Sequence, residues 1–272
     1  IFGYFGMPRM GIAGAAVATV IGQIIAAILA LVFNLKCNRE LNISMKGFRP
    51  NGHLIVQIYK VGAPSIVVQA IGSLMTYGMN LILAAFGSAQ TVFGIYFKLL
   101  SFVFMPVFGL NNGMVPIIAY NYGAGHKDRV IKTIKHSVAY GVGIMFVGLL
   151  AMHIFPAQLM RMFDAEESLI AIGAPALETI SLSFVFAGFC IVAGSVFQAL
   201  GNGVYSMIVS VARQMCVLLP VAKLLSLSGE VTLIWWAFPI AELASVLLTS
   251  YFLVRIYRKV ICHIGEPVVQ DA

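Results

Sequence analysis

Long apolar runs divide the chain into seven predicted membrane spans. A helix needs about 20 apolar residues to cross roughly 30 Å of hydrocarbon, and each run reaches that length. The runs are continuous, so they predict helices and not the alternating strands of a membrane barrel. We therefore expect an all-α integral membrane protein with spans at 11–33, 61–86, 91–119, 135–155, 169–200, 204–227 and 231–257.

Polar residues recur inside several of these runs at helical spacing. In the second run they follow intervals of three and four residues, which places Ser65, Gln69, Ser73, Thr76 and Asn80 on one helix face. Similar faces in the third and fifth runs include Lys98, Ser101 and Asn112, and Glu178, Ser181 and Gln198. A polar face turns toward another helix or a water-filled cavity, because lipid cannot solvate it. For serine and threonine, simple helix packing is the alternative explanation.

Four ionisable residues lie well inside predicted spans: Lys98, Glu178, Arg213 and Glu242. A charge near the centre of the bilayer costs upwards of about 2.5 kcal/mol, so it lines a functional cavity or forms an ion pair. Both roles stay open here. We take Lys98 as a candidate cavity residue, and Glu178, Arg213 and Glu242 as candidates for ion pairing or ion coupling.

Prolines inside the runs are candidate hinges. Each proline removes one helical hydrogen bond and bends its helix. In a transporter such bends move and expose carbonyl groups to a cavity, whereas in a static bundle they only shape the packing. The polar faces beside them favour transport. The candidate hinge residues are Pro64, Pro106, Pro116, Pro175 and Pro239.

Composition excludes the soluble function classes. Hydrophobic residues make up 60% of the chain and charged residues 10%, where soluble domains carry about 25% charged residues. Most of the basic residues behind the net charge of +7 fall in three connections on one side: after the first run, after the third, and after the last. The positive-inside rule makes this side, and the C-terminus, cytoplasmic. The charge then faces anionic lipid, and we expect no nucleic-acid partner.

The remaining motifs favour neither an enzyme nor a metal site. The four cysteines, Cys37, Cys190, Cys216 and Cys262, lack the paired spacing of a disulfide or zinc framework. No HExxH, GxSxG or GxGxxG motif occurs. We therefore expect no catalytic residues, no metal and no cofactor.

Four stretches together resemble the multidrug and toxic compound extrusion (MATE) transporters. Residues 104–116, from Phe104-Met105-Pro106 to Val115-Pro116, and the following Tyr120-Asn121-Tyr122-Gly123 are similar to the eighth span and next loop of that family. Residues 11–19, 62–64 and 236–242 are similar to parts of its sixth, seventh and twelfth spans. The resemblance covers essentially the whole chain.

This resemblance implies twelve spans in two six-helix lobes. The chain begins with Ile1-Phe2-Gly3, and we expect it to be the C-terminal portion of a longer protein. Residues 1–33 would hold the last helix of the N-lobe, 34–60 a basic cytoplasmic linker with an interfacial helix, 61–257 the six-helix C-lobe, and 258–272 a cytoplasmic tail.

The resemblance also implies a function. MATE transporters of the bacterial branch export amphipathic, often cationic drugs and dyes in exchange for H⁺ or Na⁺ by alternating access. We expect such small molecules and the bilayer of the bacterial cytoplasmic membrane as partners, and no obligate protein partner. The alternative is a lipid-linked oligosaccharide flippase of the same superfamily, which needs a cleft rich in cationic residues.

One departure concerns the coupling ion. Some family members bind Na⁺ through a glutamate of the seventh span and an aspartate of the tenth, where this chain has Gly72 and Phe186. Neither side chain can bind a cation, so we expect the coupling site in the N-lobe. The substrate cleft is expected to be lined by Gln69, Ser73, Thr76, Asn80, Lys98, Ser101, Asn112, Glu178, Ser181 and Gln198.

Overall fold

The computed structural model describes residues 10–37 and 49–265, and these residues form helices joined by short connections, without a strand. The chain divides into two units, Ile1–Ile55 and Val56–Ala272. In the first unit lies α1 (Gly11–Cys37), a long apolar helix with Lys36 in its last turn. Residues 38–48 of the predicted linker and 266–272 of the predicted tail lie outside the described residues.

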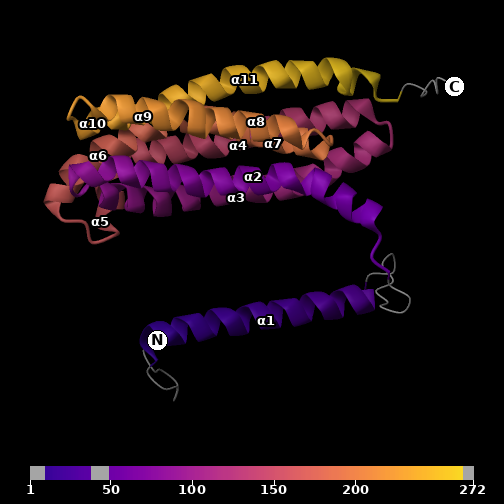
Figure 1. The fold of residues 1–272 in the computed structure, drawn as a ribbon, viewed down its shortest axis with the longest axis horizontal. Coiled ribbons are helices and arrows are strands. Elements are labelled where there is room, and N and C mark those ends of the chain that lie inside the picture. Colours follow the sequence, from indigo (N-terminus) through magenta and orange to yellow (C-terminus); the bar gives the residue numbers. More distant parts are fainter. Residues whose placement is uncertain (1–9, 38–48, 266–272) are drawn as a thin grey trace. The chain divides into compact units, whose positions relative to one another are not determined.

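The second unit is one helical bundle (Figure 1). Its long helices are α2 (Gly52–Leu83, which starts at the unit boundary), α3 (Ala89–Gly123), α4 (Lys127–Ile154) and α11 (Ala237–Lys259). Shorter elements complete it: η2 (Ala84–Phe86), α5 (Pro156–Arg161), α6 (Glu167–Ser181), α7 (Phe184–Ala199), α8 (Gly203–Val211), η3 (Ala212–Leu218), α9 (Leu219–Ser226), α10 (Val231–Ile234) and η4 (Ile261–His263).

The structure confirms the seven predicted spans. Six segments of the described residues are long and apolar enough to cross a membrane by themselves. Three of them combine several elements: α2 and η2 form the span Gly52–Phe86, α8, η3 and α9 form Gly203–Ser226, and α10, α11 and η4 form Val231–His263. The remaining predicted span, 169–200, corresponds to the pair α6 and α7, which passes the same test when the two helices are taken together.

The span that the sequence pattern predicted at 169–200 is bent. The helix axis changes direction by 49° between α6 and α7. At the break, Ser183 donates a hydrogen bond to the carbonyl oxygen of Ile180 (2.6 Å), and Ser181 donates to that of Glu178 (2.9 Å). These side-chain bonds satisfy carbonyl groups that an unbroken helix would pair with backbone N–H groups. The bend therefore lies at serines, six residues beyond the candidate hinge Pro175.

A π-helical segment, η3, interrupts the span that the pattern predicted as a single helix at 204–227. The segment ends just before Pro220, which has no N–H to donate to the preceding turn. A wider turn is one way for a helix to accommodate that missing bond, and such π segments occur often at functional sites. Here it carries Arg213 and Gln214.

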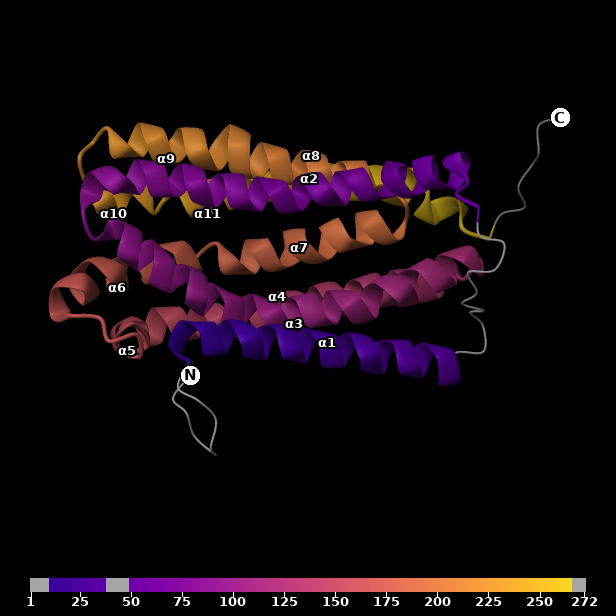
Figure 2. The ribbon, with the colours of Figure 1, turned by 60° about the horizontal axis from the view of Figure 1, so that its bottom comes forward.

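Helix α7 lies at the centre of the bundle, in contact with α3, α4, α8 and α11 (Figure 2). Its closest approach is to α4 through two glycines. A Cβ atom on Gly188 would lie 3.1 Å from the carbonyl oxygen of Gly141 and 2.9 Å from Cγ of Met145. Larger residues at Gly188 would therefore push the two helices apart.

Helix α2 is continuous from Gly52, within the linker 34–60 where the resemblance implied an interfacial helix. It touches the bundle at two glycine positions. A Cβ on Gly203 would lie 3.6 Å from Cβ of Pro64, and one on Gly78 would lie 2.8 Å from a methyl group of Leu219. Between these two contacts, α2 borders a cavity.

Candidate functional site

A cavity of about 880 Å³ lies within the second unit, between α2, α3, α7, α8, η3 and α11. Ligand pockets commonly measure about 300–1,000 Å³, so this one has room for a drug-sized molecule. One part of its wall is aromatic and contains Phe97, Phe104 and Phe108 of α3. The rest is rich in neutral polar side chains, chiefly serines, threonines and amides. This mixture suits an apolar molecule that carries a few polar groups.

Five of the ten residues predicted for the substrate cleft line this cavity. Helix α2 supplies three of them, α3 one and α7 one, and they are Gln69, Ser73, Thr76, Asn112 and Gln198. Gln198 also donates a hydrogen bond to Ser206 of α8 (3.2 Å), which is itself on the wall. Of the candidate hinges, Pro116 lines the cavity.

The other five predicted cleft residues do not line it. Asn80 donates to the carbonyl oxygen of Thr76, and the exposed Ser101 donates to that of Phe97. Lys98 is exposed, with its ammonium nitrogen 5.7 Å from the ring centre of Phe163. Because Lys98 follows Phe97, it is turned by about 100° from the position that faces the cavity.

Glu178 and Ser181 are the remaining two, and both lie before the bend between α6 and α7. The cavity residues of this span begin only at Cys190, well beyond the bend. Glu178 is half-buried and Ser181 is buried. The change of direction explains why residues on one face of the sequence pattern do not share one cavity.

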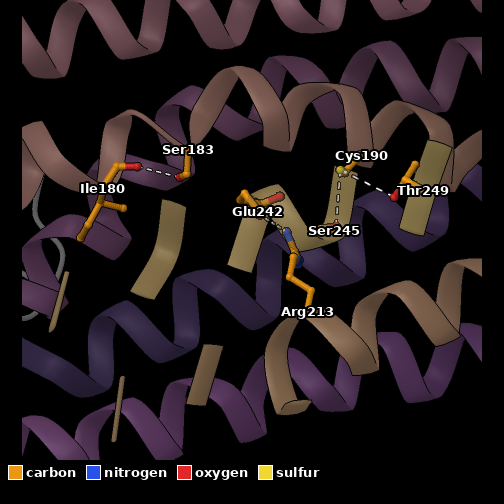
Figure 3. A network of polar contacts seen from close by, with 7 residues as sticks. All are labelled: Ile180, Ser183, Cys190, Arg213, Glu242, Ser245 and Thr249. Atoms are coloured by element: carbon orange, nitrogen blue, oxygen red, sulfur yellow. Dashed lines mark hydrogen bonds and ion pairs between the residues drawn. The ribbon is translucent and has the colours of Figure 1, made fainter. Parts of the chain in front are cut away.

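Of the three candidates for pairing or coupling, the structure joins two. The guanidinium of Arg213 donates from Nη1 to Oε1 of Glu242 at 2.5 Å (Figure 3). The side chain of Arg213 is 25% exposed and that of Glu242 is 9% exposed. Glu178 takes part in no ion pair among the described residues. The pair neutralises two charges that would each be costly alone in the membrane.

The ion pair stands between the large cavity and a smaller one of about 110 Å³. Arg213 lines both, while Glu242 lines only the smaller. Glu242 Oε2 and Gln214 Oε1 are buried and find no hydrogen-bond partner among the described residues. Buried oxygens of this kind are normally satisfied by water or a ligand. The smaller cavity has room for a few water molecules.

Sequence reasoning did not place several polar wall residues, among them three that contact one another. Ser245 and Thr249 of α11 both direct their hydroxyl groups to the sulfur of Cys190 on α7, at 3.4 and 3.7 Å (Figure 3). All three line the large cavity. The spacing from Glu242 to Ser245 to Thr249 follows one helix face, and that was the available signal.

The long apolar helices and the cavity among them define an α-helical membrane protein. The MatE family model matches residues 64–224, which is more than half of the chain. The chain therefore belongs to the MATE family, as its sequence motifs indicated. Members of this family are transporters and not enzymes.

Curated relatives share this family. The multidrug export protein MepA of Staphylococcus aureus (strain N315) is 27% identical over 244 residues, which cover 89% of this chain and 52% of that protein. MepA of Staphylococcus haemolyticus is 25% identical over 256 residues, 94% of this chain and 56% of that protein. The chain thus spans about half the length of the curated relatives it matches.

Solved structures agree. The MATE multidrug transporter DinF-BH, solved in complex with R6G, superimposes with a TM-score of 0.80 at 33% identity, over 93% of this chain and 56% of that one. A MOP superfamily transporter from Pyrococcus furiosus gives a TM-score of 0.82 at 21% identity, over 98% of this chain and 60% of that one. The second likeness shows the fold alone.

Proposed function

We propose that this protein works in secondary active multidrug efflux, exporting amphipathic cationic drugs or dyes in exchange for H⁺ or Na⁺ by alternating access. The cavity of about 880 Å³ carries this proposal, because it combines an aromatic wall with neutral polar groups inside a membrane bundle. Such a wall accommodates varied apolar bodies and orients them with few hydrogen bonds. The multidrug export relatives support the same function.

The bends of the bundle support alternating access. The junction of α6 and α7 and the π-helical segment η3 both interrupt spans that border the cavity. Discontinuous helices at a binding site are the elements that move in many transporters. We include the candidate hinge prolines in this proposal. Pro64, Pro106 and Pro116 lie inside α2 and α3, Pro175 lies in α6, and Pro239 lies in the first turn of α11.

We infer that the C-terminus faces the cytoplasm of the bacterial cell. Lys127, at the start of α4, donates a hydrogen bond to the carbonyl oxygen of Cys262 at the end of the last span (2.9 Å). Two of the basic connections therefore meet at one end of the bundle (Figure 1). The acidic residues Asp164, Glu166 and Glu167 follow α5 at the other end. The positive-inside rule then assigns the basic end to the cytoplasm.

We further infer that the coupling ion binds in the N-lobe that the family architecture implies. Gly72 lines the cavity without a side chain, and Phe186 is an apolar residue. Among the described residues, no Asp or Glu lines the large cavity. A flippase for lipid-linked sugars is less well supported, because binding a pyrophosphate needs several cationic groups. Among the described residues that line the large cavity, Arg213 is the only lysine or arginine.

The test is ethidium efflux from proteoliposomes that contain the full chain. Efflux is measured with an imposed pH gradient, an imposed Na⁺ gradient, or neither. We expect efflux only with a gradient, and the effective gradient identifies the coupling ion. If folded protein moves no cationic dye under any gradient, the efflux proposal fails and the flippase becomes the better account.

A further inference from the structure

A single charged side chain lines the large cavity among the described residues. Among the described residues that line it, Arg213 is the only basic or acidic side chain. Glu242, its partner, reaches only the smaller cavity. A molecule in the large cavity therefore meets a cation on the wall, whereas the carboxylate that balances it lies behind the arginine. This asymmetry favours a substrate with a negatively charged or strongly accepting group.

Arg213 retains hydrogen-bonding capacity on the cavity side. A guanidinium carries several N–H donors in a planar fork, and the structure assigns only Nη1, which donates to Glu242. The side chain is also 25% exposed, although it lies within a membrane span. The remaining donors match the two oxygens of a carboxylate, which arginine binds through parallel hydrogen bonds.

The arginine is held in place at the wall. Glu242 anchors one end of the guanidinium from α11, and its side chain is nine-tenths buried. The wider π-helical turn of η3 carries Arg213 between the two cavities. A donor that is already positioned loses little conformational freedom when a ligand binds, so its hydrogen bonds contribute more to affinity.

The surroundings of Arg213 suit the rest of such a ligand. Phe97 and Phe104 line both cavities together with Arg213, so an aromatic body can pack beside the guanidinium. Ser206 and Ser210, from the turns just before Arg213, add hydroxyl groups on the same wall. An aromatic acid is the chemical class that uses both features.

We propose that Arg213 is a specificity-determining residue that binds the carboxylate of amphipathic aromatic substrates, with Glu242 as its positioning residue. The proposal rests on the efflux function and adds a substrate class to it. The ion pair is neutral as a whole, so a positive group elsewhere on the substrate is tolerated. Zwitterions with a carboxylate therefore belong to the class, and simple cations bind without using this contact.

The test compares two dyes that differ at one group. Rhodamine 110 has a free carboxyl group, and rhodamine 123 is its methyl ester with the same ring system. Binding of each dye to the full chain in lipid nanodiscs is measured by fluorescence polarisation. We expect the wild type to bind rhodamine 110 about tenfold more tightly, the size of a hydrogen-bonded contact to a charged group.

The decisive variant is Arg213→Gln combined with Glu242→Gln, which removes both charges and leaves neither stranded. We expect it to lose the preference for rhodamine 110, so that the affinities for the two dyes differ by less than about twofold. Arg213→Lys keeps the ion pair but lacks the planar fork, so we expect a reduced preference. Arg161→Gln, at an exposed ion pair away from the cavity, is the matched control and retains the preference.

Equal binding of the two dyes by the wild type would overturn the inference, as would a preference that survives in the double variant. Failure of the wild type to bind either dye would overturn it as well. The efflux proposal is judged separately by ethidium, which has no carboxylate. Gradient-driven ethidium efflux without carboxylate preference leaves efflux standing and removes only the role of Arg213.

Discussion

The Arg213–Glu242 pair predicts an asymmetry in stability between two single variants. Arg213→Gln strands a carboxylate that is 9% exposed, and leaving a buried charge unpaired costs about 3–5 kcal/mol. Glu242→Gln strands a guanidinium that is 25% exposed and lines the large cavity. The loss of stability in Glu242→Gln should therefore be smaller than that in Arg213→Gln, but larger than the roughly 0–1 kcal/mol of an exposed ion pair. We therefore expect Arg213→Gln to be the more destabilising change.

The double variant completes the cycle. Two glutamines leave neither charge of the pair stranded, so the double variant should be more stable than the sum of the single losses implies, by about 2 kcal/mol. The assay is thermal unfolding in nanodiscs followed by tryptophan fluorescence. The reporter is Trp235, which is fully buried and packs against Phe93. Phe93 in turn contacts Phe238, which lines the smaller cavity beside the ion pair. For a bundle of this size, each kcal/mol shifts the melting temperature by about 2–4 °C.

Two results would refute this reasoning. One is equal melting temperatures for the two single variants, because the difference in exposure then has no energetic effect. The other is a double variant whose loss equals the sum of the single losses, because the two side chains then do not interact. Arg161→Gln removes an exposed ion pair and should change stability by less than about 1 kcal/mol.

Three further predictions concern packing, substrate contact and orientation. Gly188→Ala should destabilise the bundle by about 1–3 kcal/mol, because its methyl group meets a backbone carbonyl of α4, whereas Gly143→Ala meets open space; equal unfolding temperatures would contradict this. Gln69→Ala should alter the relative efflux rates of several dyes in proteoliposomes, and an unchanged spectrum would make Gln69 a packing residue. In a cysteine-free background, an impermeant maleimide added to intact cells should label Ser228→Cys but not His126→Cys, and the opposite pattern would invert the proposed orientation.

The spans could be predicted from the sequence because their signal is local. Crossing a bilayer demands a run of apolar residues, and every such run became a span. The bend between α6 and α7 could not be predicted in the same way. It depends on Ser181 and Ser183 bonding back to carbonyl groups, and serines do this in straight helices too. The π-helical segment before Pro220 has the same ambiguity.

Only half of the predicted cleft residues line the cavity. Periodicity shows which residues share a helix face, but not how far along the helix the cavity extends or which helices pack against that face. Gln69 and Asn80 belong to one polar face of α2, yet only Gln69 lines the cavity. Lys98 has the charge expected of a site residue, but the adjacent Phe97 takes the cavity position. Arg213 and Glu242 are 29 residues apart in the sequence, and only the packing of η3 against α11 brings them together.

The α2 wall of the cavity also bears on how the substrate range can evolve. A Cβ placed on Gly72 meets nothing within 4 Å, although Gly72 lines the cavity. A larger residue there takes up cavity volume without displacing any neighbour in the fold. Its cost to folding is small, so selection acts on it through the shape of the cavity alone. One mutation at this position can therefore change which molecules fit the cavity while the fold remains stable.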